Sequence, residues 1–135
     1  MAIFSLDPKL EADTVEIMRY DLCRVLMMKD ANYPWVILVP ARANMVEIHE
    51  LEEHDQQQLM REITLTSERL KAGFEATKIN VGALGNVVSQ LHVHVIARFD
   101  GDPAWPDPVW GKFAPSPYPE GDLDVWVEGL RKLLA

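Results

Sequence analysis

The clearest pattern in this 135-residue chain is the stretch Gln90-Leu91-His92-Val93-His94-Val95-Ile96. Its apolar and nitrogen-bearing residues alternate, and side chains alternate between the two faces of a β-strand. The pattern predicts a strand over about 89–99, with Gln90, His92 and His94 on one face and apolar side chains on the other. Because same-face neighbours lie about 7 Å apart, the two imidazoles can flank one small anion or one metal ion.

The sequence on either side of this strand predicts an α+β fold. Leu59, Ile63, Thr66 and Leu70 recur at three- and four-residue steps, which is typical of one face of an amphipathic helix. Short turns separate apolar runs, which indicates an antiparallel sheet of about five strands. We expect strands at 14–19, 22–28, 33–40, 79–83 and 89–99, and helices near 8–13, 52–74 and 122–134.

Composition and charge limit the class of protein. A chain of this length is expected to form one domain over 1–135, and 48% hydrophobic with 25% charged residues is ordinary globular composition. The formal net charge of -8 argues against a nucleic acid polymer as partner. The single cysteine, Cys23, excludes an intramolecular disulfide and a thiolate zinc cluster. With no leader-like or membrane-spanning apolar segment, a cytoplasmic protein is expected.

The histidine pair permits three interpretations on the residues alone. A neutral imidazole is nucleophilic near pH 7 and can carry a phosphoryl group until water removes it. Alternatively, His92 and His94 could bind a metal, which would need Asp100 or Asp102 to complete the ligand set. The third interpretation is a solvated strand face without chemistry.

Three neighbouring stretches carry a resemblance to a known family. They are Ile79-Asn80-Val81-Gly82, Gly85-Asn86-Val87-Val88 and Gln90-Leu91-His92-Val93-His94-Val95-Ile96-Ala97-Arg98. Together they resemble the signature of the histidine triad (HIT) nucleotide-binding hydrolases. The order of a hairpin, a long helix and two strands is also similar. The resemblance covers about 20–99 and implies a HIT-like fold, while the segment 100–135 lies outside it.

The resemblance implies a role for each of four residues. His92 matches the nucleophile, which would attack the α-phosphorus of a nucleotide conjugate and form a nucleotidyl-histidine. His94 would hydrogen-bond phosphate or leaving-group oxygens. Asn86 lies where the family has an amide donor to the phosphate, and Asp30 lies near the family's ribose-binding position.

One residue departs from the family pattern. Gln90 stands where the first histidine of the triad is expected. Its side-chain amide can donate a hydrogen bond to phosphate but cannot carry a proton. If the backbone carbonyl at this position orients the nucleophile instead, the replacement has no cost.

The expected function follows from this resemblance. It is hydrolysis of, or nucleotidyl transfer from, nucleoside monophosphate conjugates such as dinucleoside polyphosphates or phosphoramidates. The resemblance also implies a homodimer. No cofactor and no protein-bound metal are needed, although a polyphosphate substrate can arrive with Mg²⁺. A nucleotide-binding module without turnover and a His-ligated metal protein are the alternatives.

The segment after the histidine strand has a distinct composition. Six of the nine prolines lie between Pro103 and Pro119, together with Trp105 and Trp110. Proline excludes regular helix and central strand here, and the aromatic content predicts an ordered loop packed over something. Either tryptophan could stack on a nucleobase or seal an interface.

Overall fold

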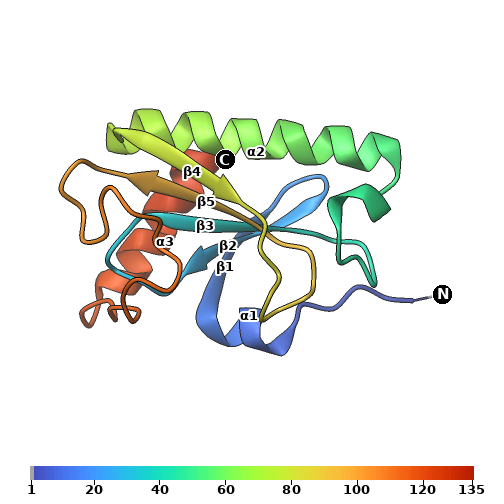
Figure 1. Ribbon diagram of the computed structural model, residues 1–135, viewed down its shortest axis with the longest axis horizontal. Helices are drawn as coiled ribbons and strands as arrows, with labels where there is room; N and C mark the ends of the chain where they lie inside the picture. Colours follow the sequence, from blue (N-terminus) through green and yellow to red (C-terminus); the bar gives the residue numbers. More distant parts are fainter. Residues whose placement is uncertain (1) are drawn as a thin grey trace.

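The computed structural model describes residues 2–135 and contains one five-stranded antiparallel sheet (Figure 1). The strand order is β1-β2-β3-β5-β4, and each neighbouring pair is antiparallel. This confirms the predicted α+β class. The strands are β1 (Thr14–Arg19), β2 (Cys23–Met28), β3 (Trp35–Pro40), β4 (Lys78–Gly82) and β5 (Val93–Arg98).

Helices cover the sheet on both faces. The long helix α2 (Glu53–Phe74) and the C-terminal helix α3 (Asp122–Leu134) share one core cluster with the sheet. The short helix α1 (Pro8–Asp13) lies on the opposite face, below the sheet in Figure 1. A single 3-10 turn, η1 (Ile48–Glu50), precedes α2. The two long helices therefore occur where their amphipathic patterns predict them.

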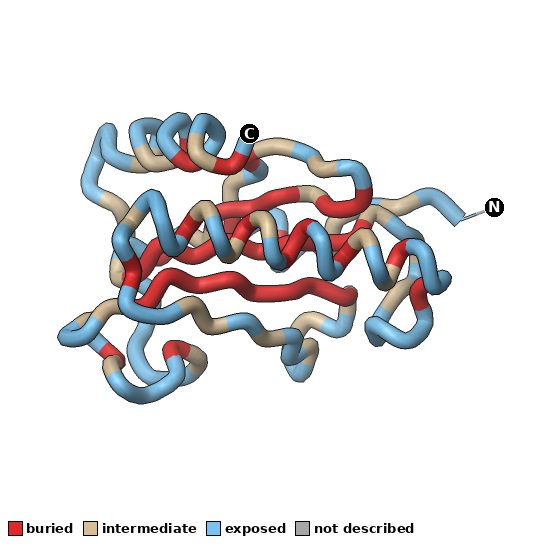
Figure 2. The backbone as a smooth tube through the Cα atoms, turned by 90° about the horizontal axis from the view of Figure 1, so that it is seen from above, coloured by how far each residue is buried: buried red, intermediate tan, exposed pale blue. Residues whose placement is uncertain are grey.

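The middle of the sheet is buried on both faces. Every residue of β3 and β5 is buried, and Figure 2 shows these strands in red beneath α2. Such double burial explains why β3 has an almost continuous apolar sequence rather than an alternating one. Burial on both faces also makes the central strands a rigid support for any side chain that they carry.

The histidine strand begins later than the sequence predicts. The strand β5 starts at Val93, so residues 89–92 precede the ladder. The backbone N–H of Leu91 donates to the carbonyl of Met45 instead of to a strand, at 2.9 Å. The carbonyl of Gln90 is used by an imidazole, as described below. These backbone groups have partners outside the sheet, which is why alternation alone overestimates the strand.

The proline-rich segment is an ordered loop, as predicted, and one buried cation holds its first part. Arg98 is 1% exposed and pairs with Asp102, with Nε 2.8 Å from Oδ2 and Nη2 3.0 Å from Oδ1. Its guanidinium also donates to the carbonyl of Asp107 at 2.9 Å and lies over the rings of Tyr33 and Trp105. The loop is thereby fixed over the face of the sheet that carries α1.

Within residues 2–135, no helix combines the length and apolar character that crossing a bilayer requires.

Candidate active site

The structure brings the two motif histidines together in one place. The rings of His92 and His94 have centroids 4.9 Å apart and cross at 67°. Both residues are buried, at 7% and 6% exposure. They line a cavity of about 460 Å³ together with Asn86 and Asp30. Four of the five residues that the sequence singles out therefore meet around one cavity.

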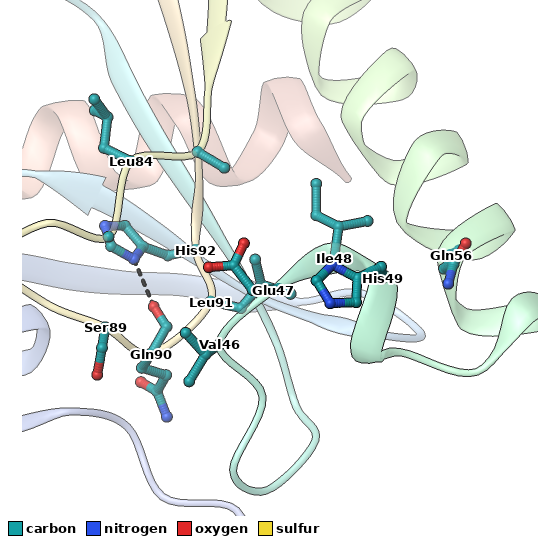
Figure 3. Close-up of a pocket in the computed structure, with 12 residues that line it drawn as sticks. Val46, Glu47, Ile48, His49, Gln56, Leu84, Ser89, Gln90, Leu91 and His92 are labelled. Carbon is teal, nitrogen blue, oxygen red and sulfur yellow. Dashed lines mark hydrogen bonds between the residues drawn. The ribbon is translucent and has the colours of Figure 1, made fainter.

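The hydrogen bond of His92 determines its tautomer. Its Nδ1 lies 2.7 Å from the backbone carbonyl oxygen of Gln90, as the dashed line in Figure 3 shows. A carbonyl can only accept a hydrogen bond, so Nδ1 carries the proton. In a neutral ring the lone pair then belongs to Nε2. In its neutral form His92 therefore offers the Nε2 lone pair for chemistry.

His94 makes the opposite kind of contact. Its Nδ1 lies 3.0 Å from Nε1 of Trp35, at the start of β3. An indole N–H is only a donor, so Nδ1 of His94 is the acceptor. Burial, followed by the charge of His92, lowers the pKa of His94 to about 4. His94 is therefore neutral near pH 7.

Gln90 is the predicted site residue that does not reach the cavity. Its side-chain oxygen accepts the backbone N–H of Asp7 at 2.9 Å, and its amide nitrogen donates to the carbonyl of Ser5 at 2.8 Å. The side chain extends away from His92 in Figure 3. Both polar atoms of this amide hold the N-terminal segment, so its contact with phosphate stays a prediction, and Gln90 lines the neighbouring groove beside His92. The backbone carbonyl is the group that Gln90 contributes.

Asp30 lies two residues after the end of β2 and links the cavity to the C-terminal loop. It is 3% exposed, and its Oδ1 accepts the backbone N–H groups of Asn32 at 3.0 Å and Ser116 at 3.2 Å. The N–H of Ala31 donates to the carbonyl of Ser116 at 2.7 Å. This second anchor fixes the loop beside the carboxylate.

The cavity has largely apolar walls. Trp110 stands edge-on to His94 and to Trp35, with ring centroids 5.4 Å and 6.4 Å away. Trp105 instead covers Arg98, so the two tryptophans of the loop have different roles. Other apolar side chains that line the cavity are Leu10, Met28, Ile37, Leu84, Val87, Val88, Val109, Phe113 and Pro115.

A second groove also reaches His92. It has a volume of about 360 Å³ and is lined by Glu47, His49, Gln56 and Ser89 among others (Figure 3). His92 is the histidine that contacts both spaces. A group bound to His92 therefore has room in two spaces.

The residues offer no complete ligand set for a metal. In the described part of the chain, no group of three or more His, Cys, Asp or Glu side chains could hold an ion. Asp102, a candidate third ligand, has both carboxylate oxygens bonded to Arg98. The geometry thus does not support the metal interpretation of the histidine pair.

Sequence reasoning missed Trp35 as a site residue. It precedes His94 by 59 residues and reaches it only because β3 pairs with β5. The register sets Ile37 opposite His94, and Trp35 lies two residues before Ile37 on the same face. The sequence carries no signal for this pairing between distant strands.

The protein thus combines an α+β fold around an antiparallel sheet with a pair of buried imidazoles that face a single cavity. The family profile described as the HIT domain matches residues 9–101, and the chain belongs to this family. Members of the family are generally nucleotide hydrolases and nucleotidyl transferases. The family resemblance that the histidine motif indicates is thereby confirmed.

Solved structures of histidine triad proteins are closely similar along the whole chain. One from Bradyrhizobium japonicum is 46% identical, covers 99% of this chain and 100% of its own, and has a TM-score of 0.95. One from Sinorhizobium meliloti is 46% identical, covers 96% of each chain and has a TM-score of 0.92. One from Marinobacter aquaeolei is 45% identical, covers 99% and 100%, and has a TM-score of 0.91. No curated protein matches the sequence.

Proposed function

We propose that the protein is a nucleotide hydrolase or nucleotidyl transferase that acts on nucleoside monophosphate conjugates, with His92 as the nucleophile. The observation that carries the proposal is the hydrogen bond from Nδ1 of His92 to the carbonyl of Gln90. It fixes the ring and places the single proton of a neutral imidazole on Nδ1, so that Nε2 has the lone pair. The neighbouring His94 and the family membership support the same chemistry.

The proposed reaction has two displacements at phosphorus. In the first, Nε2 of His92 attacks the α-phosphorus and forms a P–N bond, while the bond from phosphorus to the leaving group breaks. The leaving group departs with the electron pair and takes a proton from solvent. In the second, water attacks phosphorus and gives a proton to solvent, the P–N bond breaks, and its electron pair returns to Nε2. The mononucleotide is released, and an acceptor other than water gives nucleotidyl transfer.

The other cavity residues suit the parts of a nucleotide. The buried carboxylate of Asp30 can accept hydrogen bonds from ribose hydroxyl groups, and the amide of Asn86 can donate to phosphate oxygens. The apolar walls suit a base, and the volume of about 460 Å³ lies within the usual range for small-molecule sites. No cofactor is required, and Mg²⁺ would come with a polyphosphate substrate. We further propose a single HIT-like domain that works in the cytoplasm.

Trapping the covalent intermediate tests this proposal. We expect mixtures with a panel of dinucleoside polyphosphates and nucleoside phosphoramidates, quenched in alkali because a P–N bond is hydrolysed in acid, to contain protein heavier by one nucleotidyl group. Peptide mass spectrometry should locate the added mass on His92. Release of mononucleotide with no adduct, or with the adduct on another residue, would contradict the mechanism. Nucleotide binding without release would instead establish a binding module.

A homodimer is the second part of the proposal, and the edge strand β4 supports it. Among residues 2–135 strand β4 pairs with β5 alone, so the backbone groups along its outer edge have no strand partner there and can pair with another strand. Val81, near the middle of β4, is 49% exposed. We expect light scattering of the wild-type protein to give the mass of two chains and Val81→Asp to shift the mass toward one chain. The mass of one chain for the wild type would contradict the dimer.

A further inference from the structure

The hydrogen-bond partners of the two histidines place opposite requirements on their Nδ1 atoms. Nδ1 of His92 donates to a group that can only accept, the carbonyl of Gln90. Nδ1 of His94 accepts from a group that can only donate, the indole N–H of Trp35. Two rings of the same residue type, 4.9 Å apart, are thus held in different tautomers. The first presents a lone pair at Nε2, and the second presents a proton there.

We propose that Trp35 is a positioning residue that holds His94 as a neutral hydrogen-bond donor, with its Nε2–H directed to a phosphoryl oxygen in the cavity. This inference rests on the proposed function for its purpose, but the hydrogen bond itself does not depend on it. Nε2 of His94 has no hydrogen-bond partner among residues 2–135, and His94 lines the cavity. A ligand oxygen there would supply the missing acceptor.

The burial of the pair gives this contact its effect. Trp35 is 5% exposed and His94 6%, so water does not compete freely for either nitrogen. An imidazolium would carry a proton on Nδ1 as well, which would face the indole N–H donor to donor. Trp35 therefore opposes protonation of His94, in the same direction as burial. The ring stays a donor through one nitrogen instead of becoming a cation.

Other titratable groups are arranged around the same cavity. The charged ones are Lys9 and Asp13 of α1 and Asp30 after β2, and His92 is a further titratable group. None of them hydrogen-bonds to His94 in the described chain, whose ring contacts are His92, Trp35 and Trp110. Trp35 is therefore the direct partner that selects the tautomer.

Nitrogen-15 NMR of the ligand-free wild-type protein provides the first test. We expect a scalar coupling across the hydrogen bond between Nε1 of Trp35 and Nδ1 of His94. The ¹⁵N shifts of His94 should show Nδ1 unprotonated and Nε2 protonated across the neutral pH range. A proton on Nδ1 of His94, or no coupling to Trp35, would overturn the inference. This measurement needs no variant and no substrate.

Trp35→Phe removes the N–H and keeps an aromatic ring. We expect His94 to titrate at higher pH in this variant and to gain a population with Nδ1 protonated. The matched control is Trp110→Phe, because Trp110 also packs on His94 but its Nε1 makes no hydrogen bond within the described residues. In Trp110→Phe the ¹⁵N shift of Nδ1 of His94 should remain that of an unprotonated nitrogen. An unchanged titration of His94 in Trp35→Phe would contradict the role of Trp35.

Turnover separates this inference from the proposed function. If the protein releases mononucleotide, Trp35→Phe should lower kcat about three- to tenfold, the usual contribution of one hydrogen bond. Mononucleotide release by Trp35→Phe at the wild-type kcat would show that the contact does not serve the reaction. If the wild type shows the coupling but cleaves none of the conjugates, the proposed function fails while the tautomer assignment is retained.

Discussion

His92→Ala should abolish release of mononucleotide, with kcat reduced by about a thousandfold or more. Loss of a covalent nucleophile has effects of this size because no other group can form the intermediate. The carbonyl of Gln90 accepts the Nδ1 proton of His92, so Nε2 is the nitrogen that has the lone pair in the neutral ring. Steady-state assays with the best conjugate of the panel, with mononucleotide measured by chromatography, provide the measurement.

Two comparisons make this result specific. Nucleotide affinity of His92→Ala, measured by calorimetry, should remain within about tenfold of wild type because the apolar walls and Asp30 are intact. His54→Ala changes a histidine whose side chain is 72% exposed at the start of α2, and it should keep full turnover. Mononucleotide release by His92→Ala at more than a few per cent of the wild-type rate would exclude His92 as the nucleophile.

Asp102→Ala should produce the largest loss of stability among single surface-loop substitutions, about 3–5 kcal/mol. The change leaves the guanidinium of Arg98 charged and buried, with side-chain exposure of 2%, without its carboxylate. Removing one member of a buried ion pair costs more than the pair contributes. Urea unfolding followed by tryptophan fluorescence gives the free energy of unfolding.

A matched pair on the same loop gives the control. Asp107 and Lys112 form an ion pair at 2.8 Å, but their side chains are 55% and 42% exposed. Asp107→Ala should change the free energy of unfolding by less than about 1 kcal/mol, since solvent screens such a pair. Its backbone carbonyl still accepts from Arg98. Equal losses for Asp102→Ala and Asp107→Ala would show that burial of the Arg98 pair is unimportant.

The pH dependence of stability has the same origin. Burial alone raises the pKa of Asp102, but the hydrogen bonds from Arg98 and from the N–H groups of Phe99 and Trp105 outweigh it, so the pKa lies below its ordinary value. Stability from this carboxylate is therefore present above the unfolded pKa of about 3.9 and is lost as the pH falls through the lower folded value. Wild type should lose stability below about pH 4 more steeply than Asp102→Ala.

The local patterns of the sequence predict most of the architecture. Apolar spacing from Leu59 to Leu70 predicts a helix over 52–74, and α2 spans Glu53–Phe74. The Asp7-Pro8 pair predicts the short first helix, and the Asp7 side chain accepts the N–H of Lys9 at 2.8 Å. These features depend on neighbours a few residues apart, which is the range over which helical periodicity and capping act.

The contacts that the sequence does not reveal join distant segments. Gln90 binds the backbone of Ser5, 85 residues away, and Trp35 reaches His94 across 59 residues. Both depend on how the elements pack, which no local pattern specifies. The proline-rich loop shows the same difference between local patterns and long-range contacts. Its order is predictable from its aromatic content, but its path over the cavity depends on Arg98 and on Ser116 beside Asp30.

The hydrogen bond from His92 to the carbonyl of Gln90 also bears on how position 90 can change during evolution. A main-chain oxygen is present whatever amino acid the gene encodes there. A mutation at position 90 therefore leaves the hydrogen bond that orients His92 in place. The glutamine side chain can instead bind the backbone of Ser5 and Asp7. A motif that demands three imidazoles describes the side chain at this position and overlooks the oxygen that orients the ring.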